Sequence, residues 1–186
     1  MADTRRIRVL FDEEAIARRN RAMAEAIAAS HPRDLLVVAV LKGSFMFAAD
    51  LIRAMHNAGL SPQVEFVHLS SYREATISSG QVEILRDVQS EVSGRDVLLV
   101  DDILESGRTL TFAKDLLAAR GARSVKCAVL LEKPGKRAVT ITPDYVGFTC
   151  PDYFVVGYGM DVAHSYRQLP FVGVIEMDAQ TGFDGI

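Results

Sequence analysis

Short apolar runs alternate along this chain with longer segments in which apolar residues recur every three to four positions. The short runs predict strands at residues 35–41, 64–70, 97–100 and 125–131. The longer segments predict helices over residues 12–29, 45–57 and 106–120. Because repeated alternation of apolar strands and helices is typical of a parallel sheet covered on both faces, we expect an α/β fold with a mainly parallel, twisted sheet flanked by helices.

The remaining segments are rich in turn-forming residues. Residues 72–80 are polar, and residues 81–85 predict a strand that returns toward the one before it. Toward the end of the chain, short apolar stretches are broken by prolines and glycines. We expect residues 1–186 to form a single domain, in which the N-terminal segment and residues from about 140–186 build a smaller lobe over the carboxyl edge of the sheet.

Composition narrows the class of partner. With 49% hydrophobic and 24% charged residues, the chain has the composition of a globular domain and not of a disordered one. A net charge of −3 gives no long-range attraction to nucleic acid or to an anionic membrane, so we expect a small-molecule substrate. No apolar run approaches the roughly 18 residues that span a bilayer, and none resembles a secretion signal, so the cytoplasm is the expected location.

Residues 97–109 carry the most chemical information. An apolar strand ends in two adjacent acids, Asp101 and Asp102, and Glu105 precedes a small-residue turn that opens a helix. A helix start at the carboxyl end of a parallel strand presents unpaired N–H groups, which favour an anion such as phosphate. The residues of this turn are Ser106, Gly107, Arg108 and Thr109. The two acids suit hydroxyl groups or a divalent metal, so together the features predict a sugar phosphate site.

The same residues allow other interpretations. On local pattern alone, a solvated strand end followed by a turn and a helix cap explains the segment equally well. A Walker loop is disfavoured because Asp102 stands where its first glycine belongs and Arg108 replaces its lysine, and the glycine spacing of a dinucleotide site is absent. The histidines show no zinc-ligand spacing, and Cys127 and Cys150 are expected to be free thiols.

The 97–109 segment resembles the phosphoribosyl pyrophosphate motif of the type I phosphoribosyltransferases. Further matches, in order between about residues 35 and 176, point to the hypoxanthine-guanine branch of that family. They are Leu41 to Gly43, Ser71 with Tyr72, Lys133, Pro143 to Phe148, Val155 to Asp161, and Arg167. The resemblance implies transfer of the 5-phosphoribosyl group from phosphoribosyl pyrophosphate to N9 of hypoxanthine or guanine, with Mg²⁺ as cofactor, in a homodimer or homotetramer. It also implies that the smaller lobe is the hood that binds the base.

The resemblance assigns roles on the phosphoribosyl pyrophosphate side of the site. Asp101 and Asp102 would hold the ribose hydroxyls, directly or through the metal. The turn from Ser106 through Gly107 and Arg108 to Thr109 would hold the 5′-phosphate. Lys42, Gly43 and Arg167 would contact pyrophosphate, and Asp161 would contact metal. For the pair Lys42 and Gly43, a simple strand-to-helix turn is the alternative interpretation.

On the base side, Lys133 would donate to O6 of a 6-oxopurine, Phe154 would stack on the ring, and the Val155 backbone would meet its Watson–Crick edge. Glu105 stands where most relatives have an aspartate that takes the N7 proton, so it is the candidate catalytic base. The alternative interpretation of Phe154 is a core residue. The alternative interpretation of Glu105 is an acid at a helix N-terminus, where the helix dipole favours negative charge. Whether xanthine is a substrate stays open.

Ser71 and Tyr72 resemble the loop that closes over the site as a lid in this family. A strand-end aromatic is the alternative for Tyr72. Two rival functions remain: a non-catalytic regulator of the same fold that senses phosphoribosyl pyrophosphate, and a phosphoacceptor receiver domain. Receivers place their acid pair near the start of the chain and lack the Ser-Gly-x-Thr turn, while a nucleic-acid-binding regulator would need a basic face.

Overall fold

The computed structural model describes residues 6–71 and 82–176 and builds most of them around a six-stranded sheet. The order of the strands is β4-β3-β2-β5-β6-β7, and only β4 runs antiparallel to its neighbour. Their bounds are Leu36–Leu41 for β2, Gln63–Ser71 for β3, Val82–Arg86 for β4, Asp96–Leu104 for β5, Ser124–Glu132 for β6 and Tyr145–Thr149 for β7. The predicted fold class, a mainly parallel sheet flanked by helices, is confirmed.

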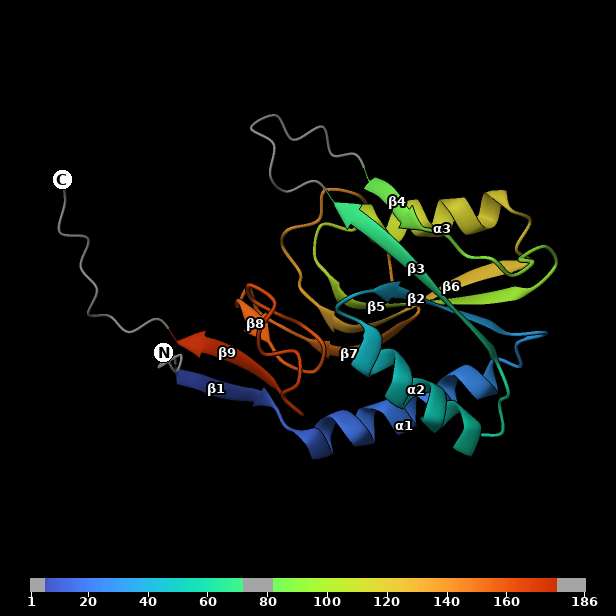
Figure 1. Cartoon of the computed structure of the whole chain (residues 1–186). Helices are drawn as coiled ribbons and strands as arrows, with labels where there is room; N and C mark the ends of the chain where they lie inside the picture. Colours follow the sequence, from blue (N-terminus) through green and yellow to red (C-terminus); the bar gives the residue numbers. More distant parts are fainter. Residues whose placement is uncertain (1–5, 72–81, 177–186) are drawn as a thin grey trace.

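Helices cover both faces of this sheet (Figure 1). Helices α1 (Glu13–Ala29) and α2 (Phe45–Asn57) lie on one face, and α3 (Arg108–Ala119) lies on the other. Alternation along β2 explains the two layers, since Val37 packs into the core under α1 and α2 while Val38 packs into the core under α3. Both faces of the central strands are therefore buried, which is why these strands are continuous apolar runs in the sequence.

The helix starts follow from local side chains. The Asp12 carboxylate caps α1 by accepting a hydrogen bond from the Ala15 N–H at 2.7 Å, so the predicted start at residue 12 is its cap. Helix α3 begins at Arg108 and not at Ser106 as predicted, because Gly107 has φ +82° and ends the preceding turn in a left-handed conformation. Ser106 and Gly107 thus belong to a loop in front of the helix.

Strand β5 is longer than the sequence predicts. The expected strand ended at Val100, before the two acids, but the ladder with β6 continues through Asp101 opposite Val129 to Leu104 opposite Glu132. Polar residues ordinarily indicate the end of a buried strand, whereas parallel pairing with a long neighbour holds the backbone of these two in the sheet. As a result, both acids are fixed on the sheet and not on a loop.

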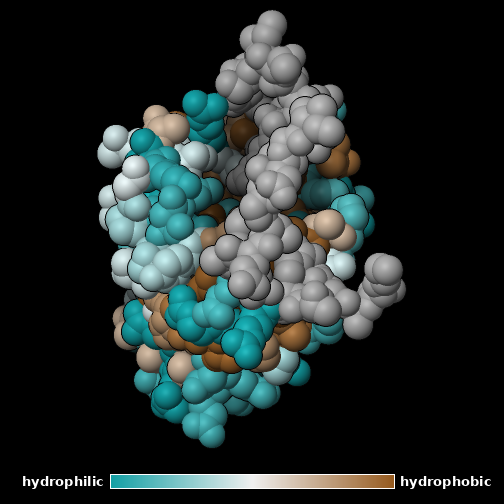
Figure 2. Space-filling model, turned by 90° about the vertical axis from the view of Figure 1, so that its left-hand side faces the viewer, coloured by the Kyte–Doolittle hydropathy of each residue, from teal (hydrophilic) through white to brown (hydrophobic). Residues whose placement is uncertain are grey.

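A second, three-stranded sheet has the order β1-β9-β8 and joins segments from both ends of the chain. Its strands are β1 (Arg6–Phe11), β8 (Val155–Val156) and β9 (Val172–Glu176), and β1 was not predicted. Strand β7, which falls within the range from about residue 140 predicted for the smaller lobe, pairs with β6 in the larger sheet. Figure 2 shows the face that lies on the left of Figure 1, where β1 and β9 lie. In the lower part of that view, hydrophobic residues lie at the surface between hydrophilic ones.

Two further predictions concern the chain as a whole. Cys127 and Cys150 are both buried and free, as predicted, and burial raises the pKa of the Cys127 thiol to about 11. Over the described ranges 6–71 and 82–176, none of the helices is long and apolar enough to cross a membrane.

Candidate active site

A pocket of about 1200 Å³ lies at the carboxyl ends of β2, β5 and β6. It brings together residues that the sequence analysis singled out from distant segments. They are Lys42, Gly43, Asp101, Asp102, Glu105, Ser106, Gly107, Arg108, Thr109, Lys133, Phe154, Val155, Asp161 and Arg167. Of the predicted lid residues, Ser71 is the last residue of β3, and Tyr72 lies outside the described residues. The predicted candidates therefore share one site, although their individual roles stay predictions.

The acid pair at the end of β5 is deeply set in this pocket. Asp101 is only 7% exposed, and its Oδ1 accepts a hydrogen bond from the Asp102 N–H at 3.0 Å. Burial raises the pKa of both carboxyls, and the charge of Asp102 raises the pKa of Asp101 further. A bound partner that supplies positive charge or hydroxyl donors would offset the free-energy cost of ionising this pair.

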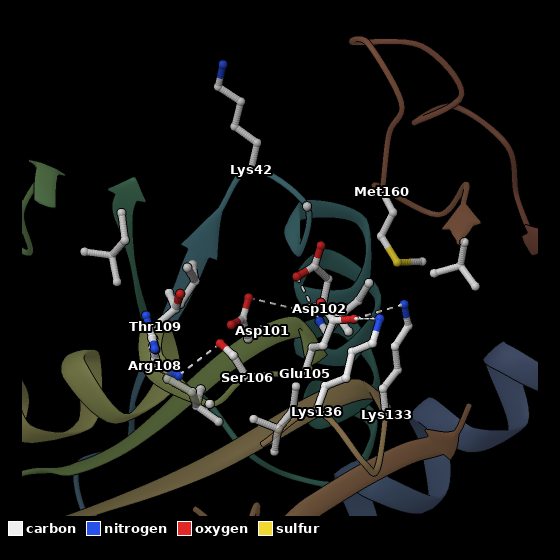
Figure 3. A pocket seen from close by; sticks show the side chains of 18 of the residues that line it. Lys42, Asp101, Asp102, Glu105, Ser106, Arg108, Thr109, Lys133, Lys136 and Met160 are labelled. Carbon is white, nitrogen blue, oxygen red and sulfur yellow. Dashed lines mark hydrogen bonds and ion pairs between the residues drawn. The ribbon is translucent and has the colours of Figure 1, made fainter. Parts of the chain in front are cut away.

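Gly43 follows β2 and lies directly against this pair. A Cβ atom at Gly43 would sit 1.7 Å from Asp102 Oδ2, so any larger residue there would displace that carboxylate. On its other side, a Cβ at Gly159 would lie 2.2 Å from the Gly43 carbonyl oxygen. The peptide joining Leu41 to Lys42 is cis, and the Lys42 side chain projects away from the two acids (Figure 3).

The loop between β5 and α3 has the shape expected of an anion site. Gly107 in its left-handed conformation turns the chain into α3, and Ser106 Oγ accepts from the Arg108 N–H at 3.4 Å. A Cβ at Gly107 would lie 3.0 Å from the Val139 carbonyl oxygen, so the loop packs closely on the segment after β6. The first residues of α3 line the pocket, and the N–H groups at the start of a helix would favour a phosphate there.

Glu105 lies close to two lysines that follow the carboxyl end of β6 (Figure 3). Its Oε1 lies 3.8 Å from Lys133 Nζ and 3.7 Å from Lys136 Nζ. Lys133 is 6% exposed and donates a hydrogen bond to the Tyr153 carbonyl at 2.7 Å, while Lys136 pairs with Asp152 at 2.7 Å. Sequence reasoning gave Asp152 no role and missed Lys136, because an exposed lysine in a Pro-Gly turn is ordinarily a surface charge.

The smaller lobe supplies the opposite wall. Phe154 is 58% exposed, which contradicts the alternative of a core residue and leaves its ring open to the pocket. Val155 beside it is buried in β8. Arg167 Nη2 pairs with Asp161 Oδ1 at 2.7 Å, and Arg167 Nη1 donates to the Gly159 carbonyl at 2.6 Å. This wall therefore offers an aromatic face at one end and a braced ion pair at the other.

Comparison with known proteins accounts for this combination. Residues 9–163 match the family model of the phosphoribosyl transferase domain. The hypoxanthine-guanine phosphoribosyltransferase of Lactococcus lactis is 43% identical over 170 residues, covering 91% of each chain, and that of Bacillus subtilis is 40% identical, covering 91% of this chain and 93% of that one. This chain belongs to the hypoxanthine-guanine phosphoribosyltransferase family. The family predicted from the sequence is thereby confirmed.

Solved structures of the family agree. The hypoxanthine phosphoribosyltransferase of Trypanosoma cruzi superposes with a TM-score of 0.88 at 37% identity, covering 95% of this chain and 94% of that one. The chain also matches the bifunctional protein TilS/HprT of Listeria innocua at 43% identity, of which it spans 26% of the length. In that family member, the phosphoribosyltransferase segment is one part of a longer protein.

Phosphoribosyltransferases of this family act with a divalent metal ion. Across residues 6–71 and 82–176, no group of three or more histidine, cysteine or acidic side chains converges to hold one. The carboxylates of buried Asp101 and half-buried Asp102 nevertheless fit a hard cation, because Mg²⁺ is usually held by one or two carboxylates together with oxygens of the substrate. Asp161, the third candidate ligand, also lines the pocket but is paired with Arg167.

Replacing Asp101 with asparagine is expected to stabilise the ligand-free phosphoribosyltransferase at neutral pH. Because burial raises its pKa, the folded chain holds the Asp101 proton more tightly than the unfolded chain, so the free energy of unfolding falls as the pH rises from 3.8 through the raised pKa. Asp101→Asn should match the wild type near pH 4 and unfold about 2–4 °C higher at pH 7.5, for a change of about 1 kcal/mol. Thermal unfolding at both pH values measures this.

Asp87→Asn is the matched control with the opposite sign. The hydrogen bonds of Arg120 lower the pKa of Asp87, so that carboxylate stabilises the fold above its unfolded pKa and the stabilisation is lost as the pH falls. Asp87→Asn should therefore lower the unfolding temperature at pH 7.5. An Asp101→Asn variant that is also less stable at pH 7.5 would contradict the expected penalty.

Proposed function

We propose that this chain transfers the 5-phosphoribosyl group of phosphoribosyl pyrophosphate to N9 of hypoxanthine or guanine, giving IMP or GMP and pyrophosphate. The observation that carries this proposal is the single pocket in which an acid pair, an anion-binding helix start and a lysine beside an exposed aromatic ring converge. The acid pair lies between the other two (Figure 3), as ribose lies between the 5′-phosphate and the base in the product. The names of the family relatives support the same reaction.

In the proposed reaction, the bond between ribose C1 and pyrophosphate breaks, and pyrophosphate keeps the electron pair. Purine N9 forms the new bond to C1, and the proton on N7 passes to the Glu105 carboxylate. Positive charge grows on the ribose ring in between. Asp101 and Asp102 are proposed to orient the ribose hydroxyls and to favour that charge, because fixed charges stabilise a transition state without reorganisation.

Mg²⁺ is the proposed divalent metal, and Asp101, Asp102 and Asp161 are its proposed protein ligands. When bound, Mg²⁺ supplies electrostatic stabilisation to the leaving pyrophosphate. The chain's own contribution at that end is the braced ion pair of Arg167 and Asp161 and the closely approaching backbone at Gly43. Assembly into a homodimer or homotetramer and a cytoplasmic location remain predictions.

Selectivity for a 6-oxopurine is proposed to come from Lys133. Its ammonium group is nearly buried and donates to the Tyr153 carbonyl, and because an ammonium group carries three donors, others remain for O6 of the base. The 6-amino group of adenine presents donors at the same place, which a lysine cannot accept. The rejected base would leave a buried charge without a full set of acceptors, which is costly.

Initial rates with phosphoribosyl pyrophosphate and Mg²⁺ across hypoxanthine, guanine, xanthine and adenine test the proposal. We expect hypoxanthine or guanine to exceed adenine by at least about 10⁴ in kcat/KM, because a site built for one hydrogen-bonding pattern discriminates by that order. Release of pyrophosphate and absorbance of the nucleotide provide two independent readouts. Binding of phosphoribosyl pyrophosphate without transfer to any base would instead support the non-catalytic regulator.

A further inference from the structure

The turn after β6 is bound to the loop that carries Glu105. Beyond the last rung of the β5–β6 ladder, three consecutive carbonyls of that loop accept hydrogen bonds from this turn. The Leu104 carbonyl accepts from the Lys133 N–H at 3.0 Å, and the Ser106 carbonyl accepts from the N–H groups of Ala138 and Val139 at 2.9 and 3.2 Å. The carbonyl between them, on Glu105, is reached by a side chain.

That side chain is Arg137. Its Nη1 donates to the carbonyls of both Leu104 and Glu105 at 2.8 Å, and its Nη2 pairs with Glu132 Oε1 at 2.7 Å. The guanidinium is largely buried, with 23% of the side chain exposed. The rigid Arg137 guanidinium therefore joins the end of β6 to the peptide group next to the Glu105 side chain.

We propose that Arg137 is the positioning residue for Glu105, an inference that rests on the proposed function. The orientation of a peptide plane sets the direction of the adjoining side chain, and the Glu105 carboxylate has one more methylene than the aspartate of most relatives. A longer side chain needs its backbone held more firmly if its carboxylate is to meet one atom of the base. Arg137 is not among the residues that line the pocket, although its stem lies beside Gly107, so we infer that it acts through Glu105.

Only arginine suits this position. A guanidinium presents five donors in a planar fork, so it reaches two carbonyls and a carboxylate at once. A lysine at 137 would offer a single ammonium nitrogen and could not keep the spacing of all three contacts. Arg137→Lys thus retains the charge and most of the stem while removing the fork.

The test compares Arg137→Met with the wild type in steady-state kinetics. Misplacing a reacting group by about 1 Å costs roughly 100-fold, so we expect kcat to fall about 10- to 100-fold. The KM values for purine and phosphoribosyl pyrophosphate should change less than about threefold, because Phe154 lies on another segment, Lys133 keeps its backbone bond to Leu104, and Ser106 keeps its two backbone bonds. Unchanged kcat, or a rise in KM alone, would overturn the proposal.

A double-mutant cycle with Glu105→Gln separates positioning from general structural support. If Arg137 acts through the carboxylate, Arg137→Met in the Glu105→Gln background should lower kcat by less than about twofold. A full 10- to 100-fold effect in that background would overturn the proposal. Wild-type chain without transfer activity toward any of the four bases would overturn the proposed function itself, which is a separate outcome.

Arg120→Met is the matched control. Arg120 also pairs its guanidinium with a carboxylate, that of Asp87, at similar exposure but outside the pocket lining. Its kcat should stay within about twofold of the wild type, and an equal loss in both variants would overturn the proposal. If Arg137→Met does not fold, Arg137→Lys is expected to lose about tenfold in kcat at an unchanged unfolding midpoint, and full activity of Arg137→Lys would overturn the proposal.

Discussion

Glu105→Gln is expected to lower turnover by about 10²- to 10⁴-fold, the range typical for loss of a general base. The amide keeps the size of the side chain and can still contact Lys133 and Lys136, but it cannot take the N7 proton from the base. The KM values for purine and phosphoribosyl pyrophosphate should change far less than kcat. Steady-state kinetics with hypoxanthine, with both substrates varied, measures the two effects separately.

Glu105→Asp serves as the control for this prediction. It restores the carboxylate that most relatives have, one methylene shorter, so it should retain most of the activity that Glu105→Gln loses. If Glu105→Gln turned over at the wild-type rate, Glu105 would have no part in the mechanism. Equal losses in both variants would point to side-chain position, and not to proton transfer, as the important property.

Gly43→Ala is expected to lower kcat/KM by at least about 100-fold with little loss of stability. The new Cβ would lie 1.7 Å from Asp102 Oδ2, so the carboxylate must move by more than about 1 Å. An aspartate side chain moves readily, which spares the fold. The displaced group, however, is one of the two acids that we assign to the ribose.

Gly59→Ala is the contrasting control because it should lower stability and leave activity unchanged. Gly59 has φ +85°, and the space within 4 Å of an added Cβ is open, so alanine there meets strain but no neighbour. It should lose about 1–2 kcal/mol of stability, the cost of a left-handed conformation for a residue with a Cβ, and keep its activity. Kinetics and thermal unfolding of both variants should show a loss of activity in Gly43→Ala alone and a loss of stability mainly in Gly59→Ala. A fully active Gly43→Ala would show that the position of Asp102 matters little.

The parts of the site that could be predicted are those carried by one continuous segment. The strand, acids and turn of residues 97–109 show their chemistry in local order, and the family resemblance then located Lys133 and Arg167. Helix α2 was predicted with its observed bounds because its apolar periodicity and following glycine are both local. Such features need no knowledge of distant contacts.

The parts that were missed depend on partners far along the chain. Strand β1 is stabilised by pairing with β9, more than 150 residues later, and none of its own residues is fully buried. Strand β7 joins the larger sheet beside β6, where a Cβ at Gly147 would lie 2.4 Å from the Leu130 carbonyl oxygen. Arg137 was missed because its three acceptors lie at residues 104, 105 and 132, so its sequence neighbours give no sign of them.

The pairing of β1 with β9 has a consequence for the order in which the molecule forms during synthesis. All six strands of the larger sheet have been made once residue 149 is added, and the core under α3 can then close. The core under α1 and α2 also needs residues between Cys150 and Val174, so it closes later. Strand β1, although made first, has no partner until residues 172–176 emerge from the ribosome. The nascent chain can therefore hold its acid pair and the loop of residues 106–109 before the wall bearing Phe154 exists, so the part of the site that we propose binds the purine is completed last.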